Sequence, residues 1–180
     1  MTARGAQAAG AGRALPTALV VMGVSGCGKS TVGIEIARRL GWDFRDGDAF
    51  HPPSNVEKMR SGAPLTDDDR WPWLDAIAAE IAARESRGGH VVIACSALKR
   101  AYRDRLRASR AAIRFVHLAG SFELIDGRMK ARHDHFMPAS LLKSQFATLE
   151  PLGSEEDSVT VPVDAEPAEI AGLAIAALRG

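Results

Sequence analysis

The sequence predicts an α/β protein in which helices cover both faces of a parallel β-sheet. Short apolar runs alternate along the chain with segments whose apolar residues recur at helical spacing. The best strand candidates are apolar without interruption, as strands buried on both faces are. Such alternation builds a parallel sheet between two helical layers, and 180 residues suffice for one domain of this kind.

The expected elements follow one another closely. Residues 18–22 form a β-rich run that stops at Gly23, and residues 29–40 have apolar side chains on one helical face. Further strands are expected at residues 42–45, 90–95, 113–118 and 159–163. Further helices are expected at residues 56–59, 73–87, 101–108, 122–131, 141–146 and 168–178. The segments at 51–70 and 133–139 interrupt this alternation, and we expect substrate chemistry there.

The composition argues against several classes of function. The formal net charge is +1 with acids and bases interleaved, whereas nucleic-acid-binding proteins normally carry a basic excess or stripe. A nucleic acid is therefore not an expected partner. No apolar run approaches the roughly 18 residues of a membrane span, so a membrane is not an expected partner either. Residues 1–15, rich in Ala and Gly, predict a disordered tail before a single domain at 16–180. Cys27 and Cys95 are expected to be reduced thiols of a cytoplasmic protein.

A glycine-rich sequence directly after the first strand predicts a phosphate-binding loop. Residues 23–30 fit the pattern G-x-x-x-x-G-K-[ST]. Glycines let backbone N–H groups face a phosphate, and the positive end of the following helix favours anions. We expect ATP here, with the Lys29 ammonium at the β- and γ-phosphates and the Ser30 hydroxyl on Mg²⁺. The expected cofactor-binding residues are Gly23, Val24, Ser25, Gly26, Cys27, Gly28, Lys29, Ser30 and Thr31.

The thiol of Cys27 is expected to be reactive. It lies beside the N-terminus of a helix and near Lys29, and both features lower the pKa of a thiol. Alkylation would place bulk where phosphate must lie. The sequence therefore predicts inactivation by a thiol reagent and protection by MgATP.

Other motifs narrow the class of phosphate-loop protein. The chain has no N-K-x-D motif of the kind that reads guanine in GTPases. The strand at 90–95 ends in Cys95 and Ser96 instead of a metal-binding aspartate. A small kinase fits best, with Mg²⁺ held mainly by Ser30, phosphate oxygens and water.

Asp46 and Asp48 follow the second expected strand and predict the acceptor site. Carboxylates at positions i and i+2 of an extended segment project to the same side. Asp46 can then hold Mg²⁺ through water while Asp48 takes the proton of the acceptor hydroxyl and acts as a catalytic residue. An Asp-rich turn is the alternative interpretation, because Asp-Gly is a turn dipeptide.

The chain resembles the gluconate kinase family over residues from about 18 to 152. The segments that carry this resemblance are residues 23–30, 46–52, 55–59, 62–70, 73–74, 95–99, 102–103, 145–146 and 148–150. The resemblance implies transfer of the ATP γ-phosphoryl group to the 6-hydroxyl of D-gluconate. It also implies a P-loop kinase fold with five parallel strands, as in shikimate and nucleoside monophosphate kinases, a mobile lid and commonly a homodimer. Pro53-Ser54 departs from the family, since some relatives carry basic residues there.

A sugar acid presents several hydroxyls and one carboxylate, and the chain offers side chains for both. The candidates for the hydroxyls are Asp48, His51, Asn55 and Ser96. The candidates for the carboxylate are Arg70, Lys99 and Arg103. Alternatives remain open, since Arg103 belongs to a basic stretch typical of a solvated face and His51 fits a polar loop equally well. Three aspartates fit a helix cap better than catalysis: Asp67, Asp68 and Asp69.

Arg128 and Arg132 lie four residues apart on one expected helix, just before the pattern breaks at 133–136. This predicts a small lid at about 128–139 that brings both arginines, as catalytic residues, to the γ-phosphoryl group. A solvated helix surface is the alternative. His133 and His135 give only weak support for a metal site, because no further ligands accompany them.

The sequence therefore predicts ATP-dependent phosphorylation of D-gluconate to 6-phospho-D-gluconate, with Mg²⁺. A kinase of another small acceptor, such as shikimate or a nucleotide, is one alternative. A nucleotide-dependent switch without transfer activity is another, although such a switch needs neither acceptor residues nor a lid with arginines.

Overall fold

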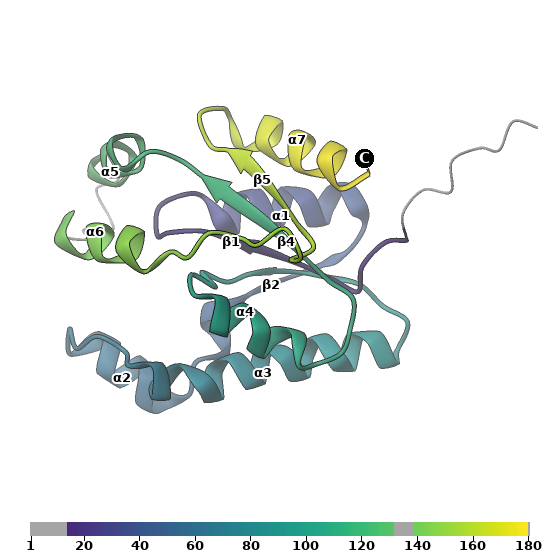
Figure 1. Ribbon diagram of the computed structural model, residues 1–180, viewed down its shortest axis with the longest axis horizontal. Coiled ribbons are helices and arrows are strands. Elements are labelled where there is room, and N and C mark those ends of the chain that lie inside the picture. The colour runs from purple at the N-terminus through teal and green to yellow at the C-terminus, as the bar shows by residue number, and fades with distance from the viewer. Residues whose placement is uncertain (1–13, 132–138, 180) are drawn as a thin grey trace, which may run out of the picture.

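The computed structural model describes residues 14–131 and 139–179, and a five-stranded parallel sheet forms its centre (Figure 1). The strands lie in the order β2-β3-β1-β4-β5, and every neighbouring pair is parallel. They are β1 (Ala18–Met22), β2 (Asp43–Asp46), β3 (Val91–Ala94), β4 (Ile113–Ala119) and β5 (Ser158–Pro162). The parallel sheet expected from the sequence is confirmed.

Helices cover both faces of the sheet, as predicted. They are α1 (Lys29–Leu40), α2 (Pro53–Arg60), α3 (Asp67–Ser86), α4 (Arg100–Arg107), α5 (Phe122–Lys130), α6 (Ala139–Thr148) and α7 (Pro167–Arg179). A 3₁₀ helix, η1 (Gly47–Phe50), follows β2. Figure 1 shows α1 and α7 on one side of the sheet and α3 and α4 on the other.

Strand β1 occupies the centre of the sheet and is completely buried, which explains its uninterrupted apolar sequence. Its side chains alternate between the two faces. Leu19 and Val21 pack in the hydrophobic cluster that includes α1 and α7. Ala18, Val20 and Met22 pack in the cluster on α3 and α4. Because β1 is fixed on both faces, the loop that follows it starts from a rigid support.

The carboxyl ends of all five strands meet at one edge of the sheet, since the strands are parallel. The order of strands reverses at β1, which pairs with β3 on one side and β4 on the other. Ligands of α/β proteins bind in the crevice that such a reversal opens. The segments after β1, β2 and β3, which carry most of the predicted site residues, converge on this edge.

Helix α3 begins earlier than the sequence pattern indicated, at Asp67 instead of residue 73. Pro72 and the polar residues before it interrupt the apolar period, so the pattern revealed only the later turns. The missed signal is a capping box, in which the Thr66 side chain accepts from the Asp69 N–H and the Asp69 carboxylate accepts from the Thr66 N–H. The interpretation of this aspartate run as a cap is confirmed for Asp69.

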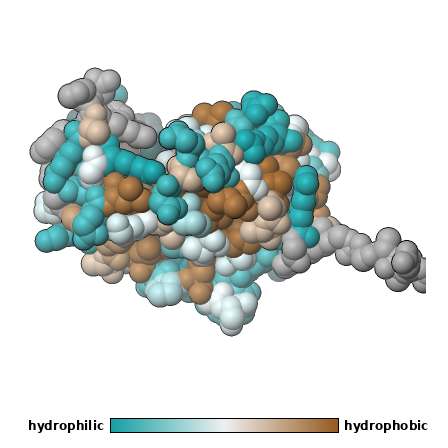
Figure 2. All heavy atoms as spheres, turned by 90° about the horizontal axis from the view of Figure 1, so that it is seen from above, coloured by the Kyte–Doolittle hydropathy of each residue, from teal (hydrophilic) through white to brown (hydrophobic). Residues whose placement is uncertain are grey.

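The helical layer seen from above carries hydrophobic patches between hydrophilic side chains (Figure 2). Ile34 on α1 and Leu173 on α7 are about half exposed.

Within residues 14–131 and 139–179, no helix is both long enough and apolar enough to cross a membrane.

Thr66→Ala should lower the free energy of unfolding by about 1 kcal/mol, because the Asp69 N–H loses its acceptor. Urea denaturation followed by circular dichroism measures this change, and the slope of the transition should stay constant. Thr66→Ser is the matched control, since it keeps the hydroxyl. Equal stability of the Ala and Ser variants would contradict a role of the hydroxyl in the cap.

Candidate active site

The loop between β1 and α1 exposes a set of backbone donors. Among the described residues, no oxygen accepts from the N–H groups of five loop and helix residues: Gly26, Gly28, Lys29, Ser30 and Thr31. Gly28 is the N-cap of α1, with φ of 96° and no side-chain hydrogen bond. These donors stand at the positive end of the helix, so the loop fits the phosphates of a nucleotide.

Neighbouring atoms leave no room for a larger side chain at two glycines of this loop. A Cβ atom at Gly26 would lie 2.6 Å from Cγ of Met129, and one at Gly23 would lie 2.8 Å from the carbonyl oxygen of Leu118. Both residues have positive φ, which favours glycine. The Lys29 ammonium folds back over the loop and donates to the carbonyl of Val24 at 3.0 Å.

Ser30 and Asp46, the two residues assigned to Mg²⁺, lie together. The Ser30 hydroxyl donates to Oδ2 of Asp46 at 3.1 Å. Asp46 ends β2, whose neighbour β3 lacks an acidic residue at its own end, so the carboxylate comes from the next strand. The described part of the chain has no cluster of three or more potential metal ligands. A serine and one carboxylate nevertheless suit Mg²⁺, which takes most of its oxygens from water and phosphates.

The geometric argument for Asp48 was wrong. Residues 47–50 form η1 instead of continuing the strand, so Asp46 and Asp48 are not paired along an extended segment. The other carboxylate oxygen of Asp46 accepts from the Asp48 N–H at 3.0 Å and caps the turn. The Asp48 side chain is 88% exposed and is therefore accessible to a substrate.

Helix α3 fixes the turn that carries Asp48. The indole N–H of Trp73 donates to the carbonyl of Gly47 at 2.7 Å. His51 stacks on the Trp73 ring with the centroids 4.3 Å apart, and its Nε2 lies 4.0 Å from Oδ1 of Asp48. Burial lowers the pKa of His51, so the imidazole is neutral at neutral pH and can accept or donate a hydrogen bond.

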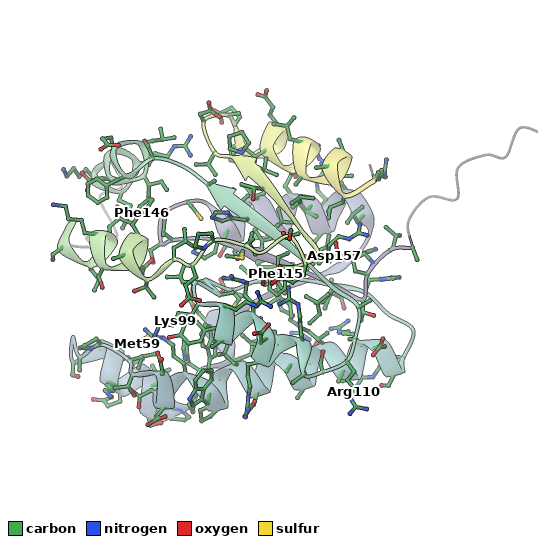
Figure 3. The ribbon with its side chains drawn as sticks, viewed as in Figure 1. Met59, Lys99, Arg110, Phe115, Phe146 and Asp157 are labelled. Carbon is green, nitrogen blue, oxygen red and sulfur yellow. The ribbon has the colours of Figure 1, made fainter. Side chains whose placement is uncertain are left out.

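Arg70 and Lys99, two candidates for a substrate carboxylate, lie close together around Asp67. Lys99 extends towards α3 (Figure 3) and donates to both carboxylate oxygens of Asp67, at 3.0 and 2.8 Å. Tyr102 also donates to Asp67 and accepts from Nη1 of Arg70 at 3.2 Å. The hydrogen bond from Lys99 is the largest cause of the lowered pKa of Asp67. Asp67 and Tyr102 also belong to this cluster, although no site role was predicted for them from the sequence.

Arg103 is not accessible to a substrate, so its assignment to the substrate carboxylate was wrong. Its side chain is 0% exposed and donates to both carboxylate oxygens of Glu156 at 2.7 and 3.0 Å. Its remaining donors bind the carbonyls of Ala97, Leu98 and Pro151. The alternative of a solvated face was also wrong for this residue, because sequence spacing cannot reveal a partner 53 positions away.

The remaining predicted residues lie around the phosphate loop. Ser96 follows β3, and its carbonyl accepts from the Gly23 N–H at 3.3 Å. Arg128 on α5 borders a hollow of about 200 Å³. The other residues around it are Gly26, Cys27, Gly28, Thr31, Val32, Ala165, Glu166, Pro167 and Ile170. The segment at 165–167 was not expected from the sequence, which has no motif there. Arg132 and most of the expected lid lie outside the described residues.

Both cysteines are buried, and the expected low pKa of Cys27 was wrong. Burial raises the pKa of its thiol more than Lys29 lowers it. Burial also raises the pKa of Cys95, to about 12. Both are free thiols. The helix N-terminus therefore acts on the loop backbone and not on a thiolate.

Comparisons with known proteins agree with this geometry. The AAA domain family matches residues 19–152. The chain is 52% identical to the gluconokinase of Gluconobacter oxydans (strain 621H), over 84% of this chain and 85% of that protein. The crystal structure of a gluconokinase from Sinorhizobium meliloti 1021 has a TM-score of 0.84 and 51% identity, over 92% of this chain and 93% of that one. Shikimate kinase from Aquifex aeolicus vf5 shares the fold alone, with a TM-score of 0.60 at 18% identity over 89% and 95% of the chains.

The parallel sheet, the glycine-rich loop and these structural neighbours define a P-loop kinase. The similarity to gluconokinases extends over most of both chains. The chain belongs to the gluconokinase family. The resemblance found in the sequence is thereby confirmed.

In the native protein, Cys27 should react with a chromogenic disulfide reagent about tenfold or more slowly than in urea, because burial disfavours the thiolate. Stopped-flow absorbance at neutral pH measures both rates. Cys27→Ser assigns the signal between the two cysteines. Rapid labelling of Cys27 in the native protein would contradict this expectation and support the low pKa first predicted from the sequence.

Proposed function

We propose that the protein transfers the γ-phosphoryl group of ATP to the 6-hydroxyl of D-gluconate, with Mg²⁺. The observation that carries this proposal is the meeting of two sites at one sheet edge. Backbone donors that have no oxygen acceptor in the described part of the chain lie after β1. Asp48 lies after β2, Lys99 after β3 and Arg70 at the start of α3. The similarity to gluconokinases, at 44–52% identity, supports D-gluconate as the acceptor.

The donor half of the site binds the nucleotide. The N–H groups of Gly26 and of the residues from Gly28 to Thr31 bind the phosphates together with the Lys29 ammonium, and Ser30 with Asp46 holds Mg²⁺. Bound Mg²⁺ would neutralise negative charge on the phosphates. Arg128, beside the hollow next to the loop, neutralises charge on the phosphates, together with Arg132 when the expected lid at 128–139 closes.

The acceptor half orients gluconate. Asp48 accepts the proton of the reacting hydroxyl, and His51 and Ser96 bind other hydroxyls. Arg70 is the best group for the carboxylate, because its Nε and Nη2 bind no acceptor within the described ranges. Lys99 is already held by Asp67, so it contributes charge more than direct contact. A cytoplasmic location and a homodimer, which the family resemblance implies, complete the proposal.

Release of ADP over a panel of sugar acids, shikimate and nucleoside monophosphates tests this function. We expect kcat/KM for D-gluconate to exceed that for every other acceptor by about tenfold or more, since a site built for a carboxylate and hydroxyls discriminates strongly. A higher kcat/KM for shikimate or a nucleotide would contradict D-gluconate as the acceptor and identify the other compound in its place. Nucleotide binding without transfer to any of them would favour a switch.

Asp48→Asn should lower kcat by roughly 10²–10⁴-fold with nucleotide affinity unchanged within about threefold, because it removes the proton acceptor but leaves the phosphate loop intact. Steady-state kinetics and titration with an ATP analogue measure the two effects. Asp68→Asn, an exposed residue in the first turn of α3, is the matched control. Loss of nucleotide affinity in Asp48→Asn would instead assign Asp48 to the metal.

A further inference from the structure

The segment at 145–150 belongs to the pattern that resembles the family, yet the site described above gives it no role. It covers the end of α6 and the two residues after it. Gln145 contacts the phosphate loop through two hydrogen bonds. The Ser25 N–H donates to Oε1 of Gln145 at 2.7 Å, and Nε2 of Gln145 donates to Oγ of Ser25 at 3.0 Å.

These hydrogen bonds divide the backbone donors of the loop into two groups. The N–H groups of Gly23, Ser25 and Cys27 donate to Ser96, Gln145 and Val24. The N–H groups of Gly26 and of the residues from Gly28 to Thr31 have no oxygen acceptor within the described ranges. Gln145 therefore fixes the loop residue directly before these donors, and it leaves them free for phosphate.

The other end of the segment contacts the loop after β3, which carries Ser96 and Lys99. The Glu150 N–H donates to the carbonyl of Leu98 at 2.8 Å. The Glu150 carboxylate accepts from the Arg100 N–H at 2.6 Å, at the first turn of α4. A single short segment thus binds the backbone on the nucleotide side and on the acceptor side.

Packing makes this segment stiff. Leu149 packs against both hydrophobic clusters, one on each face of the sheet. Phe146 on α6 (Figure 3) meets Phe122 of α5 edge to face, with the centroids 5.9 Å apart. The segment is therefore anchored to the core between its two hydrogen-bonded ends.

We propose that residues 145–150 form a brace that sets the distance between the phosphate loop and the loop after β3, which carries Ser96 and Lys99. Gln145 is then a positioning residue for phosphoryl transfer. The proposal rests on the proposed kinase function. Phosphoryl transfer depends mainly on alignment of donor and acceptor, and a displacement of about 1 Å costs about 10²-fold. Without the brace, the acceptor hydroxyl is less well aligned with the γ-phosphoryl group. Water then competes with it, and part of the ATP is hydrolysed without phosphorylation of gluconate.

Gln145→Met tests the brace, because methionine keeps the length of the side chain and loses both hydrogen bonds. We expect kcat to fall about tenfold or more and ADP formed per phosphorylated gluconate to rise above one, while the Kd of an ATP analogue changes less than about threefold. Ser144→Ala, exposed on the same helix, is the matched control and should keep a ratio of one.

The other end of the brace, at Glu150, allows an independent test. Glu150→Ala removes the acceptor of the Arg100 N–H and should also raise the ratio of ADP to phosphorylated gluconate. Glu150→Gln keeps a carbonyl oxygen there and should largely restore coupling. Rescue by the conservative variant separates positioning from a general loss of stability, which thermal unfolding of every variant measures.

Each outcome decides between interpretations. A Gln145→Met variant with normal kcat and a ratio of one would overturn the brace, as would a loss confined to nucleotide affinity. The wild-type reaction in the same assay checks the proposed function by itself. Failure of the wild type on gluconate overturns that function, and the ratio is then measured with the acceptor that the wild type uses.

Discussion

The structure depends on one constraint: the phosphate loop must keep backbone donors that no oxygen of residues 14–131 and 139–179 accepts from. An N–H group without a partner is unfavourable wherever water cannot reach it, so such donors persist only at an open end of a helix. Strand β1, buried on both faces at the centre of the sheet, holds the loop in this state. Glycines with positive φ let the chain turn there without a side chain filling the space.

The acceptor side depends on tertiary contacts that fix loops with no regular structure of their own. Trp73 holds the turn of Asp48 through the Gly47 carbonyl. Arg103 and Glu156 hold the loop after β3 from inside the protein. A buried ion pair has a large desolvation cost, and here the backbone carbonyls and the Gly153 N–H offset it by completing the hydrogen bonds of both side chains. The hydrogen bonds from Arg103 to the carbonyls of Ala97 and Leu98 connect this pair to the geometry of the loop.

Charge is balanced locally around the site. Asp67 lies between Lys99, Tyr102 and Arg70, so the cations expected to bind an anionic substrate are already ordered by an acidic side chain. One carboxylate and two cations leave a net positive charge, which suits a monoanionic acceptor. Ordering the cations before binding reduces the entropy lost when the substrate binds.

The sequence by itself determined the α/β fold, the phosphate loop and the strand ends that carry Asp46, Asp48 and Ser96. Local patterns decide these features, because residues close in sequence determine which strands are buried and where a glycine-rich loop forms. Only the tertiary structure decided that Arg103 is buried against Glu156, that residues 47–50 form η1 instead of extending β2, and that Gln145 binds Ser25. Each of these depends on a partner distant in sequence or on the competition between burial and charge, and a periodic pattern along one segment contains neither.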